Sequence, residues 1–579
     1  MLTSRRVFLG IFVVVIAALV WKYETLRRGT PIQYGSGEGP LIIPPSRDDV
    51  IERLSTEEFD MIVVGGGSTG AGTALDATSR GLRVALLEMD DWGAGTSSRS
   101  TKLLHGGVRY LRKALEKWDI SQYSLVRDAL SERATMFHQA PHLTRALPIL
   151  TPLYSWRDVP FNWFLLKLYD YISFPKMHSS FFISADTAKK EFPQLRQKDL
   201  VGAVVYYDGQ FDDARFNLAL SLTCHREGVA ALSHAQVIGV LHDGKNTSGV
   251  IVKDVVTGKE FQVKGNIVVN AAGHFADHIR LMDNPNAKPV LEAAAGTHIV
   301  LGKSFCPPDT GLLIPKTSDG RVLFMLPYQN HTLVGTTDSR TEITNNPRPA
   351  EADIVYLLKH VNEYFDTSLK RDDVISAWSG IRPLKKASEK SDTAQVSREH
   401  GVYISESGLM TIVGGKWTTY RKMSEDVVNK ALAHKGMKEP HAPSTDKLKL
   451  IGAKEYQPGY VTPSMFSWMR ADTAQHLNDA YGDQAVHVAR LSEDENLKEQ
   501  IHSRLPHLRG EIVWAVKFEN AETPVDVLMR RLSFGVLDND AAVESVDLVV
   551  ELMGRVKHWN EKEKEEMRKE TRDFFQISL

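Results

Sequence analysis

The stretch that decides the fold runs from Phe59 to Glu88 and reads FDMIVVGGGSTGAGTALDATSRGLRVALLE. Its first six residues form a short β-branched run, typical of a buried parallel strand. A glycine-rich turn, Gly65–Gly70, leads into a helical pattern that ends before Gly81, and LRVALLE forms a second strand that finishes on Glu88. Strand, GxGxxG turn, helix, strand and acidic residue in this order predict a dinucleotide-binding βαβ unit.

Each part of this unit has a physical task. Gly65 permits the tight turn, Gly67 lets the backbone approach a pyrophosphate, and Gly70 allows close packing of helix on strand. Gly66 lies between them and belongs to the same expected contact set. The helix N-terminus offers N–H groups and a positive dipole end to phosphates. Glu88 is placed to accept hydrogen bonds from a ribose diol.

The spacing of this unit alone does not separate NAD from FAD, but two later segments favour FAD. Residues 267–273, IVVNAAG, form a strand that runs into a turn of small residues, a recurrent feature of glutathione-reductase-type flavoproteins. Residues 408–416, GLMTIVGGK, form another strand that ends at Gly414 and Gly415. Two glycines there would let the backbone and a helix N-terminus approach the flavin.

The composition excludes some classes of protein. The 579 residues carry 70 Lys+Arg against 72 Asp+Glu, so the whole chain is not an electrostatic nucleic-acid binder. The 2 cysteines, Cys224 and Cys306, are too few for a disulfide framework or a Cys-rich metal site. We therefore expect neither a nucleic-acid partner nor a bound metal.

The N-terminal residues differ sharply from the rest. Val7–Trp21, VFLGIFVVVIAALVW, is an uncharged apolar run flanked by basic residues. It fits a retained membrane anchor, a cleaved secretory or twin-arginine signal, or an organellar targeting segment that is removed. The lack of a small-x-small site after Leu19 favours retention. We expect residues 1–30 to form a targeting or anchor segment in the lipid bilayer and residues 31–58 to form a Gly- and Pro-rich linker.

Motifs beyond the first strand carry a resemblance to a known family. They are residues 95–114 (GTSSRSTKLLHGGVRYLRKA), residues 335–338 (GTTD), residues 378–384 (WSGIRPL) and residues 414–422 (GGKWTTYRK). Together they resemble the FAD-dependent glycerol-3-phosphate dehydrogenases, and the Ser-Arg-Ser-Thr-Lys stretch is closer to the mitochondrial type. The likeness extends from about Phe59 to Met423 and continues more weakly beyond.

The resemblance implies a fold and an activity. The fold is α/β: a glutathione-reductase/D-amino-acid-oxidase-like FAD-binding domain interleaved with an antiparallel β substrate domain over residues 59–440, followed by a C-terminal helical cap over residues 441–579. Members oxidise sn-glycerol 3-phosphate to dihydroxyacetone phosphate with hydride transfer to FAD and pass electrons to ubiquinone. The implied location is the mitochondrial inner membrane, with the active domain on its outer face. The resemblance also adds Ser98 to the FAD contacts and leaves a homodimer open.

The same resemblance, joined to residue chemistry, predicts the substrate pocket. His105 is the expected proton acceptor, because a neutral imidazole can take a hydroxyl proton near physiological pH. His298, on a probable strand, is the second candidate, with a core histidine as the alternative. Arg109 and Arg382 suit a phosphate, since a guanidinium makes paired charge-assisted hydrogen bonds. Lys416 is expected to stabilise negative charge on reduced flavin or substrate.

Further positions qualify the resemblance. Tyr110 and Thr418 are expected to line the pocket, and Ala272 and His274 depart from the family's usual Thr and Pro. Asp538-Asn539-Asp540 begins the nearest candidate for a calcium loop, but Val543 stands where the loop needs glycine and the acidic residue at the end of the loop is missing. We therefore expect no calcium regulation there. Residues 149–182 are rich in aromatics, which would contact lipid or a quinone if exposed and would be core if buried.

Other functions remain open from the sequence. A glycerol-3-phosphate oxidase would use the same site with oxygen as acceptor. An amine oxidoreductase of the D-amino-acid-oxidase type would need a less basic pocket. A non-enzymatic, FAD-stabilised scaffold would bind flavin without reducing it.

Overall fold

The computed structural model describes residues 41–117, 120–173, 177–314, 322–366, 368–386 and 400–576. The expected anchor, residues 1–30, lies outside these residues, as do residues 31–40 of the expected linker. Within the described ranges, no helix combines the length and the apolarity that a bilayer crossing requires.

The βαβ unit of the opening stretch forms as the sequence predicts. Strands β1 and β2 pair in parallel, and helix α3 (Ser68–Ser79) connects them. They belong to an eight-stranded sheet in which β17-β18-β10-β1-β2-β7 lie side by side and β8 and β9 extend from β10. The strands are β1 (Glu58–Val64), β2 (Val84–Leu87), β7 (Ala230–Leu232), β8 (Ala235–Asp243), β9 (Asn246–Asp254), β10 (Glu260–Asn270), β17 (Gly401–Ile404) and β18 (Met410–Val413).

A second sheet has ten strands, in which β15-β11-β14-β13-β12-β4-β6-β3 lie side by side, with β16 on β11 and β5 on β6. Among the pairings described for this second sheet, only that of β4 with β12 is parallel. The strands are β3 (Leu103–Leu104), β4 (Thr144–Leu153), β5 (Phe181–Ser184), β6 (Gly202–Phe211), β11 (Leu291–Gly302), β12 (Gly311–Ile314), β13 (Leu323–Tyr328), β14 (His331–Gly335), β15 (Ser339–Arg340) and β16 (Val374–Lys385). The chain alternates between the two sheets, which confirms the predicted interleaved α/β fold.

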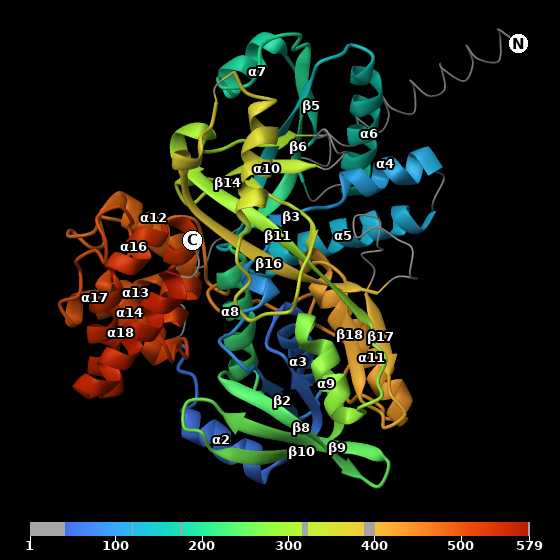
Figure 1. The fold of residues 1–579 in the computed structure, drawn as a ribbon, viewed down its shortest axis with the longest axis vertical. Coiled ribbons are helices and arrows are strands. Elements are labelled where there is room, and N and C mark those ends of the chain that lie inside the picture. The colour runs from blue at the N-terminus through green and yellow to red at the C-terminus, as the bar shows by residue number, and fades with distance from the viewer. Residues whose placement is uncertain are drawn as a thin grey trace, which may run out of the picture. The chain divides into compact units, whose positions relative to one another are not determined.

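Helices cover both sheets, as Figure 1 shows. Helices α3, α8 and α11 pack on one face of the first sheet, and the buried side chains of α3 and α11 join one core with β1 and β10. Helices α4 to α6 lie together beside the second sheet. The helices before the C-terminal region are α4 (Val108–Lys117), α5 (Ile120–Gln139), α6 (Asp158–Ser173), α7 (Ala185–Glu191), α8 (Asp213–Arg226), α9 (Ala276–Asp283), α10 (Glu351–Asn362) and α11 (Tyr420–Lys435).

The end of the expected linker is a docked helix, which corrects that part of the prediction. Helix α2 (Arg47–Thr56) begins at Ser46, whose side chain accepts a hydrogen bond from the backbone N–H of Asp49 at 3.2 Å. Val50 and Leu54, four residues apart, lie on one helix face and are buried in the core beside β10. The composition of residues 31–58 suggested a tether because Gly and Pro residues precede this helix. The burial of Val50 and Leu54 instead fixes the second half of that segment against the domain.

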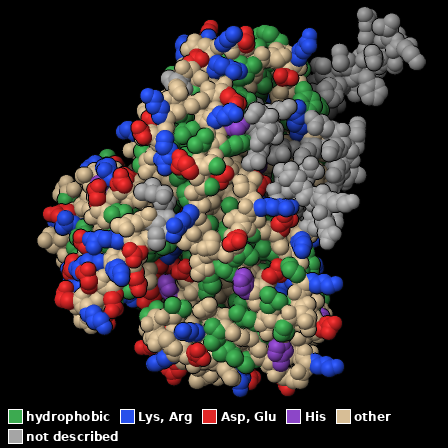
Figure 2. Space-filling view, viewed as in Figure 1, with side chains coloured by type: hydrophobic (Ala, Val, Ile, Leu, Met, Phe, Trp, Pro, Cys, Tyr) green, Lys and Arg blue, Asp and Glu red, His purple; other side chains and the backbone are tan. Residues whose placement is uncertain are grey.

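The C-terminal region is helical, as predicted, and packs to one side of both sheets (Figure 1). Figure 2 shows acidic and basic side chains intermixed over its outer surface. Its helices are α12 (Ala471–Tyr481), α13 (Ala485–Asp494), α14 (Arg509–Phe518), α15 (Phe534–Leu537), α16 (Asn539–Glu544), α17 (Val546–Lys557) and α18 (Glu561–Gln576), with a π-helical turn at Asp526–Arg531. Asp538 caps α16 by accepting from the N–H of Ala541.

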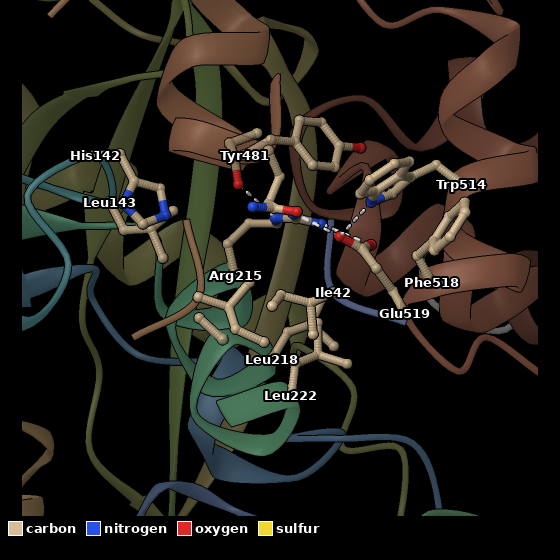
Figure 3. Close-up of a pocket in the computed structure, with 14 residues that line it drawn as sticks. Ile42, His142, Leu143, Arg215, Leu218, Leu222, Tyr481, Trp514, Phe518 and Glu519 are labelled. Atoms are coloured by element: carbon tan, nitrogen blue, oxygen red, sulfur yellow. Dashed lines mark hydrogen bonds and ion pairs between the residues drawn. The ribbon is translucent and has the colours of Figure 1, made fainter. Parts of the chain in front are cut away.

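Buried ion pairs join this region to the first sheet and to helix α8, which covers it. Arg215 of α8 donates two hydrogen bonds to Glu519, at 2.9 and 2.8 Å, and Trp514 donates to the same carboxylate at 3.2 Å. Figure 3 shows Arg215 reaching from α8 across the junction to Glu519. Arg531 makes a second two-pronged pair with Asp91, at 2.6 and 2.8 Å. Each guanidinium makes two hydrogen bonds to a buried carboxylate, whose negative charge would otherwise lack a compensating partner.

Candidate active site

A crevice opens where the parallel strands of the first sheet end. It has a volume of about 360 Å³ and follows the carboxyl ends of β1, β2, β10 and β18, the edge at which α/β sheets bind ligands. Of the predicted cofactor residues, those lining it are Gly65, Gly67, Glu88, Gly414 and Gly415.

The glycines fit a nucleotide for two different reasons. A Cβ on Gly65 would lie 2.5 Å from the carbonyl oxygen of Ala271, and one on Gly70 would lie 1.7 Å from the carbonyl oxygen of Gly65. At Gly65 and Gly70 the absence of a side chain therefore allows the neighbouring backbone segments to pack closely. Gly67 faces the crevice, where a Cβ would approach only Ser97 Oγ, at 3.0 Å, so its bare backbone leaves the space that a pyrophosphate needs.

Glu88 lies where a ribose would contact the protein. Its carboxylate accepts hydrogen bonds from the backbone N–H groups of Gly66, at 2.6 Å, and Asp90, at 3.0 Å. Burial raises the pKa of Glu88 to about 7, although these two N–H groups act against the rise. Gly66 thus holds Glu88 in place and does not line the crevice. A half-buried acceptor at this point of the crevice fits the hydroxyl groups of a nucleotide.

A second cavity, of about 580 Å³, adjoins the crevice. The residues that line both are Thr96, Pro383, Gly415, Lys416 and Trp417. The second cavity is also lined by His105, His298, Arg382, Tyr110 and Thr418. The structure thus brings these predicted substrate residues together beside the place where a flavin ring would lie.

Arg382, on β16, lines this cavity and is held there by polar contacts. It donates to Thr336 Oγ1 at 3.0 Å and to the carbonyl oxygen of Thr337 at 3.2 Å, and it forms an ion pair with Asp338 at 3.1 Å. A Cβ on Gly296 would lie 2.4 Å from its guanidinium, so that glycine makes room for it. Arg382 is a positioned cation with a carboxylate partner.

His298 is buried on β11. Its ring stacks on Trp378 with centroids 4.2 Å apart, and its Nε2 lies 2.9 Å from Thr101 Oγ1. Burial, with the nearby charges of Arg382 and Lys102, lowers the pKa of His298 well below its ordinary value. A neutral imidazole locked by stacking and a hydroxyl contact is suited to donating or accepting one hydrogen bond at the cavity wall.

His105 has the more open position of the two histidines. Its side chain is 27% exposed, and its Nδ1 lies 2.7 Å from Oδ2 of the fully buried Asp208 on β6. The sequence interpretation missed Asp208. Its signal was a carboxylate inside the apolar strand 202–211, GAVVYYDGQF, since a buried acid needs partners.

Lys416 lies at the boundary of the two cavities. Its Nζ is 3.9 Å from the ring centroid of Tyr110, a cation–π contact. The next residue, Trp417, donates from its indole to the carbonyl oxygen of Ser97 at 2.8 Å. This bond ties the glycine-rich end of β18 to the turn Thr96–Ser98, which sequence interpretation did not single out beyond Ser98.

Two of the predicted site residues, Arg109 and Ser98, remain to be placed. Arg109 is the second residue of α4, but its side chain lies outside the described residues. Ser98 is buried and lines neither cavity, and its carbonyl oxygen accepts from Lys102 at 3.2 Å. His274, a departure from the family pattern, does line the crevice, with Nδ1 3.4 Å from Thr96 Oγ1.

Comparisons with known proteins agree with this geometry. A family described as FAD dependent oxidoreductase matches residues 60–421, and one described as the C-terminal domain of alpha-glycerophosphate oxidase matches residues 443–564. The chain is 45% identical over 553 residues to the mitochondrial glycerol-3-phosphate dehydrogenase of Homo sapiens, covering 93% of this chain and 76% of the relative. It is 41% identical over 557 residues to that of Arabidopsis thaliana, covering 92% and 89%.

A solved structure adds the cofactor. The glycerol-3-phosphate dehydrogenase from Bacillus halodurans, complexed with FAD, is 29% identical, with a TM-score of 0.74, and the match covers 92% of this chain and 97% of that one. The flavin crevice, the adjoining basic cavity and this extent of identity together establish that the chain belongs to the FAD-dependent glycerol-3-phosphate dehydrogenases of the mitochondrial type and that its cofactor is FAD.

Proposed function

We propose that this protein oxidises sn-glycerol 3-phosphate to dihydroxyacetone phosphate and delivers the electrons to ubiquinone. The observation that carries the proposal is the 580 Å³ cavity, in which His105, Arg382 and Lys416 adjoin the flavin crevice. Two cations suit a phosphate dianion, and an imidazole suits removal of a hydroxyl proton. The named relatives support this substrate.

In this proposal the residues divide the work. When bound, FAD supplies the two-electron acceptor for the hydrogen that leaves C2. Arg382, with Arg109 as the second proposed guanidinium, binds the phosphate and so orients C2. His105 accepts the C2 hydroxyl proton, and His298 is the alternative acceptor. The ammonium of Lys416 stabilises negative charge that develops beside it.

The residues proposed to hold FAD follow from the crevice. Gly65, Gly66, Gly67 and Gly70 form the turn, with Gly67 beside the pyrophosphate. Glu88 accepts from the ribose. Residues 414 and 415 let the backbone of β18 and the following helix approach the flavin, and Ser98 supports the turn beside it.

An apolar wall of the cavity supports a quinone as the acceptor. Leu165 and Leu166 of α6 and Phe324 of β13 line this wall. The same helix exposes aromatic side chains, with Trp163 41% and Tyr171 64% exposed. An apolar path bordered by exposed aromatics fits an acceptor that reaches the enzyme from lipid.

We further propose a mitochondrial location, supported by the names of the relatives. The finer parts of the proposal are an inner-membrane site with the active domain on the outer face, and anchoring through residues 1–30. Fractionation of tagged full-length protein, with and without residues 1–30, tests the inner-membrane site and the anchor. Loss of membrane association on truncation supports the anchor, and unchanged association contradicts it.

An anaerobic titration tests the activity. Adding glycerol 3-phosphate to the purified protein should bleach the flavin absorbance, and adding a soluble ubiquinone analogue should restore it. Absence of bleaching would contradict the proposed oxidation and favour an FAD-stabilised scaffold. Rapid restoration by oxygen alone would favour the oxidase, which the match of residues 443–564 to an oxidase C-terminal domain keeps as the second candidate. Bleaching by a D-amino acid instead would favour the amine oxidoreductase.

A further inference from the structure

Asp208 makes four contacts beside the substrate cavity, one of them to His105, which lines it. It lies on β6 and is fully buried, and it is not among the residues that line the cavity. Its Oδ2 lies 2.7 Å from His105 Nδ1. Its Oδ1 accepts from the backbone N–H of Gly106 at 3.1 Å, from the Tyr169 hydroxyl at 2.7 Å and from the Arg133 guanidinium at 2.5 Å.

The surroundings of Asp208 keep it ionised. Burial by itself raises the pKa of a carboxyl, but the hydrogen bonds from His105 and Tyr169 and the positive charge of Arg133 hold the pKa of Asp208 below its ordinary value, and a protonated His105 lowers it further. The buried phenol of Tyr206 also faces it. An ionised carboxylate only accepts hydrogen bonds, so the proton between Asp208 and His105 belongs to His105 Nδ1. The other ring nitrogen, Nε2, is then unprotonated in the neutral imidazole.

We infer that Asp208 is a positioning residue of the proposed reaction: it fixes the His105 tautomer and ring plane so that the Nε2 lone pair is the proton acceptor. This inference rests on the proposed function. In the step, the substrate O–H bond breaks and an Nε2–H bond forms, while the C2 hydrogen leaves with two electrons to the bound FAD. The resulting imidazolium lies against the Asp208 carboxylate, which stabilises it.

Neighbouring side chains support a fixed ring and not merely a fixed turn. The His105 ring meets the edge of Phe324, with centroids 5.6 Å apart, so packing and the hydrogen bond act on the same ring. Gly106 lets Tyr169 approach, since a Cβ there would lie 2.1 Å from its hydroxyl. Arg133 balances the charge of Asp208 at Oδ1, while the imidazole contacts Oδ2. Strand β6 and helices α5 and α6 thus all converge on one carboxylate.

The test uses full-length, FAD-loaded wild type, Asp208→Asn, His105→Asn and the double variant. The amide of Asp208→Asn has nearly the shape of the acid, but its NH₂ donates toward Nδ1 and turns an N–H of His105 toward the cavity. We expect the rate of flavin reduction at saturating glycerol 3-phosphate to fall by about 10²- to 10⁴-fold. The substrate concentration for half-saturation and the FAD content should stay near wild type. In the His105→Asn background, Asp208→Asn should cause no further loss.

Asp76→Asn is the matched control. Asp76 is also fully buried and pairs with Arg80 at 2.6 Å, but it contacts no residue of the cavity described above. It should lower thermal stability and leave the reduction rate unchanged. Equal slowing by Asp76→Asn, additive losses in the double variant, or wild-type rates in Asp208→Asn would each overturn the inference while leaving the proposed function intact. Failure of the wild type to be reduced would overturn both.

A spectroscopic measurement decides the case if Asp208→Asn does not fold. Histidine labelled with ¹⁵N in the wild-type holoenzyme reports which ring nitrogen carries the proton, and His105→Asn assigns the signal. A neutral His105 protonated on Nδ1 supports the inference. Protonation on Nε2 overturns it.

Discussion

At the scale of single residues, the site depends on a cation and a neutral imidazole that are held in place before any substrate arrives. Arg382 already contacts Thr336, Thr337 and Asp338, and His298 already stacks on Trp378. Such contacts reduce the side-chain entropy that binding would otherwise cost. Preorganised charge is also what stabilises a transition state most effectively.

Replacing Arg382 tests its proposed phosphate contact. Arg382→Ala should lower kcat/KM for glycerol 3-phosphate by about 10- to 100-fold, mainly through KM, because one charge-assisted contact contributes about 1.5–3 kcal/mol. FAD should remain bound. Steady-state kinetics measure kcat/KM, and the flavin spectrum of the purified variant measures the FAD content. Asp338→Asn, which keeps the guanidinium, should have the smaller effect, and normal kinetics in Arg382→Ala would remove this residue from the site.

Filling the crevice at Gly67 tests the proposed FAD contact. Gly67→Val should reduce the FAD content of the purified protein severalfold, because the new side chain occupies the space beside Ser97 where the pyrophosphate fits. The ratio of flavin to protein absorbance measures it. Gly302→Ala is the control, since its Cβ would meet only Ser304 Oγ, at 3.9 Å. Full FAD content in Gly67→Val would contradict the assignment.

At the scale of elements, local pattern and tertiary packing decide different things. Strand β1 and helix α3 follow from alternation, glycine placement and the switch from strand to helix period. Helix α2 does not stand out by composition, since it follows a Gly- and Pro-rich stretch, but its two buried residues fix it beside β10. Element boundaries in such stretches depend on what the chain packs against.

Shortening Leu54 tests whether α2 is part of the folded domain. Leu54 is fully buried, so Leu54→Ala should lower the free energy of unfolding by about 2–5 kcal/mol through lost apolar burial and a cavity. Glu52→Ala, on the exposed face of the same helix, should change it little. The midpoint of thermal FAD release compares the two. Equal midpoints would show that the helix does not contribute to stability.

At the scale of the whole molecule, the C-terminal helices are joined to the flavin sheet by buried charges. His234, after β7, contacts Asp526 at 3.0 Å, and Asp526 also pairs with Arg530. Burial alone would lower the pKa of His234, but the charge and hydrogen bond of Asp526, with Asp91 and Asp90, raise it to about 9. The junction is therefore sensitive to alkaline pH.

The sign of this effect is fixed by the two states of His234. Its folded pKa of about 9 exceeds the unfolded value of about 6.5, so its contribution is complete below pH 6.5 and is lost as the pH rises through 9. The shift corresponds to roughly 3 kcal/mol. His234→Gln should therefore destabilise the protein at pH 6 and much less at pH 10. Unfolding midpoints across this range measure it, with the exposed His434→Gln as control. A pH-independent difference would contradict the prediction.

The sequence by itself determined the flavin-binding βαβ unit, the two later glycine turns and the family. It also singled out a few of the residues that line the cavity, namely His105, Tyr110, His298, Arg382, Lys416 and Thr418. Each of these rests on local periodicity or on a motif whose residues are close in the chain, and backbone hydrogen bonding and side-chain alternation encode such features directly. That is why Gly65, Gly67, Glu88 and Lys416 could be placed before the fold was known.

Only the tertiary structure decided which buried charges compensate one another. Asp208 meets Arg133 across 75 residues, Arg215 meets Glu519 across 304, and Arg531 meets Asp91 across 440. No local pattern specifies these partners, because each pair forms only when separate elements bury both charges together and desolvation makes an unpaired charge costly. The local strands, helices and glycine turns can thus be predicted from the sequence pattern, whereas the pairing of the buried ions follows from the fold.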